Sequence, residues 1–160
     1  TTKGLIVTNK MYVLKQQQLE HIISVEIPEN AKEIGEAIAM GDLRENAEYK
    51  AAREKQAQLN TTVTKLQEEI DRAQIFDPTT ITTARVSFGT TVTLKNNKTN
   101  ENEEFTILGP WESDPENKII SYMSPFGNAI LNSKEGDALT FEINEREFAY
   151  TVVKIKAATF

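Results

Sequence analysis

Asp42 and Glu45 are the residues whose types and spacing first suggest chemistry. They stand three positions apart, and paired carboxylates can hold a hard cation, although two are too few for a metal cage of their own. The same spacing has a structural explanation. Gly41 is a natural residue to end one helix, and Asp42 with Glu45 resembles a capping box that opens the next helix. Because helix caps are far commoner than functional sites, spacing alone favours the cap.

Other familiar site chemistry is excluded by composition. The chain has no cysteine and a single histidine, His21, so it forms neither a disulfide framework nor a thiolate zinc site nor a histidine cluster. No apolar run approaches the length of a membrane span, and the first residues lack the apolar core of a signal peptide. We therefore expect a cytoplasmic protein without a membrane partner.

The charge balance argues against duplex DNA as the main ligand. The net charge is −6, with 10 basic and 12 acidic residues up to Phe76 and 8 basic and 12 acidic residues from Asp77 onward. Neither half has the net basic charge on which non-specific DNA binding generally relies. The expected partner is a protein.

The two carboxylates would be positioned by two helices, which the spacing of apolar residues in the first half of the chain predicts. A coiled-coil spacing of apolar residues runs through Leu59, Val63, Leu66, Ile70 and Ala73. An earlier helix is predicted from Asn9 to Met40, with a kink or short break near Ile27 caused by Pro28. Only residues 41–44 separate the two helices, so they must run antiparallel as a hairpin that extends roughly 45 Å.

The second half has the alternating pattern of strands. After a linker around residues 77–83, we predict five or six antiparallel strands, a turn at Asn96 and Asn97, a tight connection at Glu145 and Arg146, and one short helix between Ser124 and Lys134. The fold class is α+β, with the hairpin in residues 1–77 and a small sheet domain in residues 78–160.

The stretch around the two carboxylates resembles a known signature. Gly41 to Tyr49 reads GDLRENAEY and is followed by AAREKQ after Lys50, which is similar to the signature of the bacterial Gre transcription factors. The resemblance covers nearly the whole chain, and it departs from the family pattern at Ala57 to Asn60. It implies an N-terminal antiparallel coiled coil and a C-terminal FKBP-like domain.

The resemblance also implies a function. Gre factors enter the secondary channel of bacterial RNA polymerase and stimulate its cleavage of backtracked RNA, so the chain would be a monomer when free and not itself an enzyme. Asp42 and Glu45 would be donated to the Mg²⁺ of the polymerase active site, and the chain would need no cofactor of its own.

Further residues take roles through the same resemblance. Tip support falls to Asn46 and Tyr49, contact with the nascent RNA 3′ end to Arg44, Lys50 and Arg53, and binding of the polymerase channel rim to Ser124, Pro125 and Phe126. Each group also has a purely structural explanation. The tip-support residues could bond local backbone or pack, the basic residues could form ordinary salt bridges along a helix, and the last group could simply connect the sheet to a helix.

Two competing functions stay open. A Gre homologue can enter the same channel and inhibit the polymerase, although inhibitory relatives have a more heavily acidic tip than this one. The second half alone would also suit a prolyl isomerase or chaperone-like module, but that leaves the hairpin signature unexplained.

Overall fold

Helices fill the first half of the chain and strands the second, as the two hydrophobic periods predict. The computed structural model describes residues 4–42 and 45–160. One compact unit is the helical hairpin Tyr12–Ala73, and the other joins residues 4–11 to Gln74–Phe160. The α+β class is confirmed.

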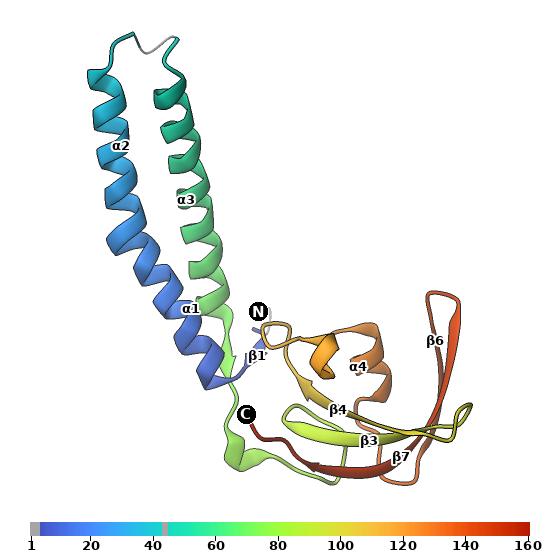
Figure 1. Cartoon of the computed structure of the whole chain (residues 1–160). Coiled ribbons are helices and arrows are strands. Elements are labelled where there is room, and N and C mark those ends of the chain that lie inside the picture. Colours follow the sequence, from blue (N-terminus) through green and yellow to red (C-terminus); the bar gives the residue numbers. More distant parts are fainter. Residues whose placement is uncertain (1–3, 43–44) are drawn as a thin grey trace. The chain divides into compact units, whose positions relative to one another are not determined.

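The hairpin consists of two antiparallel arms, drawn in blue to cyan and in green (Figure 1). The first arm contains α1 (Asn9–His21), a π-helix (Ile22–Glu26) and α2 (Ile27–Ala39), and the second is the single helix α3 (Ala47–Arg72). Leu19 and Ile22 of the first arm are buried with Leu66 and Ile70 of α3, and Leu59 and Val63 pack against them. The predicted seam of α3 is confirmed.

Pro28 affects the first arm where expected, but the helix widens there and does not break. Ile27 donates its backbone N–H to the carbonyl of Ile22, five residues back, which closes the π-turn. Proline has no N–H to donate to the fourth residue back and its ring crowds that carbonyl, so a wider turn accommodates it.

The second unit is built on a five-stranded sheet of order β5-β4-β3-β7-β6. Its strands are β3 (Thr90–Asn96), β4 (Asn102–Leu108), β5 (Ile119–Ser121), β6 (Ala138–Ile143) and β7 (Arg146–Ala157). β4 and β5 are parallel, so the prediction of a wholly antiparallel sheet was wrong. The chain between them turns back through a 3₁₀ turn at Pro115–Asn117, so that β5 runs beside the last three residues of β4, from Thr106 to Leu108. The expected likeness to FKBP stays a prediction.

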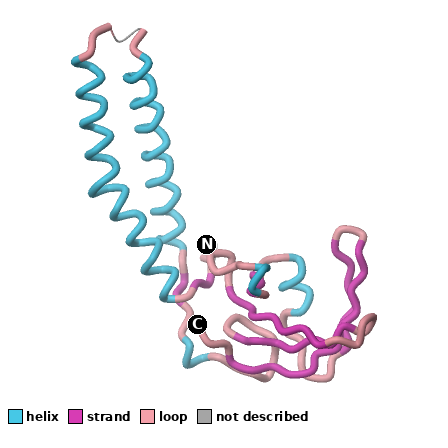
Figure 2. Tube along the Cα trace, in the orientation of Figure 1, coloured by secondary structure: helices cyan, strands magenta, loops and turns pink. Residues whose placement is uncertain are grey.

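The sheet is curled, as the tube trace shows (Figure 2), and the short helix α4 (Pro125–Ile130) contributes Ile130 to the apolar core of the unit. The core consists of Val86, Val92, Leu94, Phe105, Ile107, Ile130, Tyr150, Val152 and Ile155. The tight connection before β7 is formed by Asn144 and Glu145, with φ of 51° and 67°, and lies one residue earlier than predicted. Positive φ at both central residues is typical of a two-residue hairpin turn.

A small parallel pair of strands was not predicted. β1 (Ile6–Val7) pairs with β2 (Gln74–Ile75), and these backbone bonds group residues 4–11 with the sheet unit. The sequence-based ranges instead placed both strands with the hairpin, because two-residue strands leave no periodic pattern. In the described residues, no helix is both long and apolar enough to cross a membrane.

Candidate functional site

The first arm ends in a tight turn immediately before Asp42. Met40 and Gly41 donate their N–H groups to the carbonyls of Ala37 and Ile38, at 3.2 and 3.5 Å. Gly41 has a φ of +130°, a conformation that side chains rarely adopt, and this explains glycine at the point where the chain leaves the helix. The predicted role of Gly41 as the residue after the helix is confirmed.

Asn46, and not Asp42, caps the second arm. Helix α3 begins at Ala47, and the side-chain oxygen of Asn46 accepts the backbone N–H of Tyr49 at 3.0 Å. The capping-box explanation of Asp42 and Glu45 is therefore wrong, because the cap lies beyond both of them. The structural role that spacing favoured for the two carboxylates is filled by another residue.

Asn46 also connects the two arms. Its side-chain nitrogen donates to the carbonyl oxygen of Ala37 at 2.7 Å, near the last turn of α2. One amide thus satisfies an unpaired N–H at the start of α3 and a carbonyl at the end of α2. This bond fixes the separation of the two helix ends from which the tip loop starts, as expected of a residue that supports the tip.

Asp42 and Glu45 are both exposed on the tip loop. Leu43 and Arg44, which stand between them, lie outside the described residues, so the predicted RNA contact of Arg44 has no structural account. Two carboxylates offer hard oxygen ligands but cannot complete the octahedral set that Mg²⁺ demands.

The basic residues predicted to contact RNA differ in their surroundings. Arg53 donates Nε to the hydroxyl of Tyr49 at 3.0 Å and Nη1 to Oε1 of Gln56 at 2.7 Å. Lys50 is exposed one turn nearer the tip. Tyr49 was expected to pack across the hairpin, but these contacts direct its hydroxyl to a neighbour on its own helix.

The residues predicted to bind polymerase begin helix α4. Ser124 caps it, since its hydroxyl accepts the N–H of Gly127 at 3.1 Å and donates to the carbonyl of Ser121 at 2.7 Å. Phe126 packs on four aromatic rings, with centroid distances of 5.0 to 5.9 Å. Only Pro125 is exposed. Ser124 and Phe126 therefore have structural roles, and Pro125 is the member of the group that a partner can reach.

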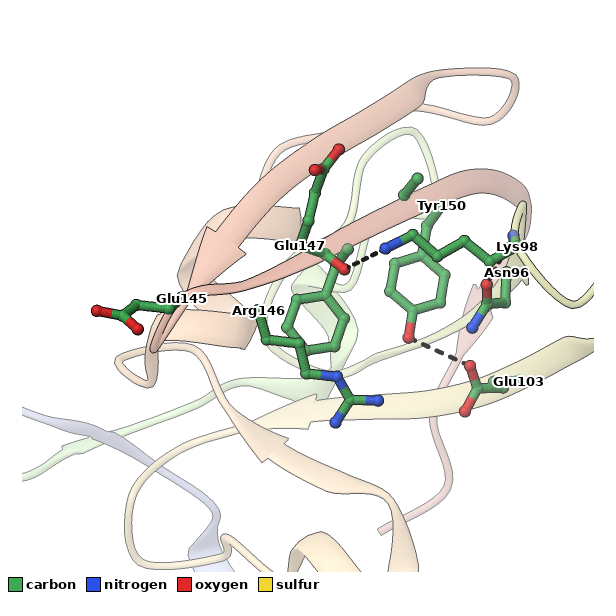
Figure 3. Close-up of a pocket in the computed structure, with 9 residues that line it drawn as sticks. Asn96, Lys98, Glu103, Glu145, Arg146, Glu147 and Tyr150 are labelled. Atoms are coloured by element: carbon green, nitrogen blue, oxygen red, sulfur yellow. Dashed lines mark hydrogen bonds between the residues drawn. The ribbon is translucent and has the colours of Figure 1, made fainter.

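A pocket of about 450 Å³ lies beside the β6–β7 hairpin of the sheet unit (Figure 3). In it, Tyr150 donates its hydroxyl to Glu103 at 3.2 Å, and Lys98 donates to the carbonyl of Glu147 at 2.8 Å. Burial, reinforced by the charge of Glu103, raises the pKa of Tyr150 to about 12. A phenol that holds its proton so firmly is unsuited to acid–base chemistry near neutral pH.

Known proteins similar to this chain decide its family. A family model described as "Transcription elongation factor, N-terminal" matches residues 5–75, and one described as "Transcription elongation factor, GreA/GreB, C-term" matches residues 81–157. Transcription elongation factor GreA of Treponema pallidum is 58% identical over 156 residues, which cover 98% of this chain and 96% of that protein. The chain belongs to the GreA/GreB family of transcription elongation factors.

Other relatives are more distant. The GreA factor of Thermodesulfovibrio yellowstonii is 37% identical over 154 residues, covering 96% of this chain and 98% of that protein. The crystal structure of GreA factor homolog 1 of Thermus thermophilus matches with 23% identity and a TM-score of 0.43, covering 96% of this chain and 99% of that one.

Sequence patterns missed two polar residues of this GreA/GreB family member. Asn30 is buried in the hairpin and donates to the carbonyl of Ala52 at 3.0 Å, whereas the helical repeat of small and apolar residues runs through its neighbour Ala31. Gln56, the partner of Arg53, was not singled out, and its position three residues after Arg53 on one helix face was the available signal.

Proposed function

We propose that this chain stimulates the cleavage of backtracked RNA by bacterial RNA polymerase. The hairpin would pass through the secondary channel and bring Asp42 and Glu45 to the active site. The observation that carries the proposal is that both carboxylates are exposed on the tip while Asn46 does the capping. Membership of the elongation factor family supports the same partner.

The two carboxylates would act as ligands for Mg²⁺ that the polymerase holds. Metal ions held with the help of these carboxylates would supply polarisation of the scissile phosphate and activation of the attacking water. The role of this chain would be to place the two carboxylates in the polymerase active site. Two helices and the Asn46 bridge between them fix the ends of the loop before it binds, so less conformational freedom is lost when the carboxylates reach the site.

The remaining candidate residues divide between RNA and polymerase. Lys50 and Arg53 are exposed on α3 near the tip and would face phosphates of the extruded RNA 3′ end. The sheet unit would hold the factor on the channel rim through the exposed start of α4 at Pro125. Cleavage would release arrested polymerase complexes in the bacterial cytoplasm. The factor would be a monomer before it binds the polymerase.

The proposal predicts that the chain has no nuclease activity of its own. Incubation of the protein with RNA and Mg²⁺ should leave the RNA intact, and addition to backtracked polymerase complexes should accelerate shortening of the transcript from its 3′ end. Robust cleavage without polymerase would refute the donation of ligands to another active site. Slower cleavage in the presence of the factor would instead identify a channel-binding inhibitor.

A further inference from the structure

The side chain of Arg53 is held in place by neighbours on both sides along α3. Besides the hydrogen bonds to Tyr49 and Gln56, its guanidinium carbon lies 5.5 Å from the centre of the Tyr49 ring. The partners are four residues before and three residues after Arg53, so all three share one helix face. An exposed arginine ordinarily samples many rotamers, and two hydrogen bonds with a ring contact restrict it.

Both partners of Arg53 are uncharged, so they orient the guanidinium without neutralising it. Lys55, two residues further on, is by contrast paired with Glu33 across the hairpin at 3.1 Å. The contacts of Arg53 within the described residues use Nε and Nη1, which leaves the N–H groups of Nη2 for another acceptor. A phosphate oxygen is the acceptor that an oriented, uncompensated guanidinium fits best.

One of the two partners of Arg53, Tyr49, lies on the tip side of it. Helical side chains lean toward the N-terminus, and the bond to Tyr49 holds the guanidinium over the preceding turn. The Cα of Arg53 is six residues beyond Ala47, so about 9 Å of helix separates it from the start of α3. An anion bound there would lie within about two helical turns of the start of α3.

We propose that Tyr49 and Gln56 are positioning residues that hold Arg53 ready for a phosphate of the extruded single-stranded RNA. This inference rests on the proposed function, and it assigns the hydroxyl of Tyr49 to the positioning of Arg53 in place of general support of the tip. Tyr49→Phe keeps the ring but removes the acceptor for Nε, and Gln56→Met removes the acceptor for Nη1 at similar length.

The test is a double-mutant cycle on backtracked polymerase complexes, in which the half-maximal concentration and the plateau rate of cleavage are both measured. Tyr49→Phe and Gln56→Met should each raise the half-maximal concentration about three- to tenfold and leave the plateau rate unchanged, because one hydrogen bond to a bound charge is affected. In an Arg53→Ala background, neither substitution should have a further effect. Lys50→Ala is the matched control, and in that background the effect of Tyr49→Phe should persist in full.

An equal effect of Tyr49→Phe with and without Arg53 would overturn the inference, and so would an Arg53→Ala variant with normal half-maximal concentration. Neither result would contradict the proposed role of the two tip carboxylates. Failure of the proposed function would show separately, as normal cleavage by an Asp42→Asn variant with Tyr49 and Arg53 intact.

Discussion

At the scale of single residues, the side-chain amide of Asn46 holds the two helix ends at the tip together. Asn46 accepts from Tyr49 and donates to Ala37, so its two ends bond to different helices. Asp42 with Glu45 matches the local pattern of a capping box, and asparagine, as at position 46, is an equally good residue type to precede a helix. The contact with Ala37 distinguishes them, and a contact between distant residues is not visible in local spacing.

The two hydrogen bonds of Asn46 can be tested separately, because a substitution by aspartate keeps the bond from Tyr49 and removes the bond to Ala37. Asn46→Asp keeps a good cap but has no N–H for Ala37, so the free energy of unfolding of the hairpin should fall by about 1 kcal/mol. Asn46→Ala loses both bonds and should cost about 2 kcal/mol. Urea unfolding followed by helical circular dichroism measures both variants. A hairpin equally stable with asparagine and aspartate would mean that the bond to Ala37 contributes nothing.

At the scale of elements, the first arm is explained by the spacing of its buried residues. From Leu19 the buried positions continue to Ile22, Asn30 and Ile34, and the partly buried Ile27 lies between them, five residues after Ile22. The π-turn accommodates that extra residue and keeps the seam facing α3. The seam of α3 was predictable because its steps of three and four are regular.

The first arm was predicted less well for two physical reasons. Leu14 continues the apolar stripe of Leu19, Ile22 and Ile23 in the sequence, but it is 40% exposed, because apolar residues also occur on the outer face of this helix. Asn30 was missed because a buried amide is acceptable once its hydrogen bond is made, here to Ala52. Hydrophobic pattern alone therefore gives the wrong residue at both positions.

The start of α4 contrasts a packed residue, Phe126, with an exposed one, Pro125. Phe126→Ala should cost about 3 kcal/mol, since the side chain leaves a cavity among four rings. Pro125→Ala should cost less than about 1 kcal/mol, because an exposed proline in the first helical turn contributes mainly through chain entropy. Thermal unfolding measures this difference. In cleavage assays, Pro125→Ala should raise the half-maximal concentration without changing the plateau rate, and a loss of plateau rate instead would remove Pro125 from the binding surface.

At the scale of the whole molecule, Tyr150 couples the stability of the sheet unit to alkaline pH. Its pKa is raised from 10.0 to about 12 in the folded protein, so the protonated phenol is favoured by folding. That contribution is fully present below pH 10 and is lost as the pH rises through the interval up to about 12.

The measurement is an unfolding series across that interval. Wild-type stability should fall more steeply than that of Tyr150→Phe, which has no phenol to ionise, and one tyrosine should develop phenolate absorbance only near pH 12. Parallel pH profiles for the two proteins would mean that the buried hydroxyl and Glu103 do not stabilise the fold in this way.

The central claim is that the tip carboxylates act chemically in the polymerase and not as parts of the fold. Asp42→Asn and Glu45→Gln keep size and polarity but remove charge, and the exposed positions of both residues predict stability within about 0.5 kcal/mol of wild type. The decisive measurement is a titration of each variant against backtracked complexes, reading the plateau cleavage rate. The account predicts a plateau rate lower by about a hundredfold or more with an unchanged half-maximal concentration, since a charged ligand is missing only at the reacting centre. A normal plateau rate from either variant would contradict it.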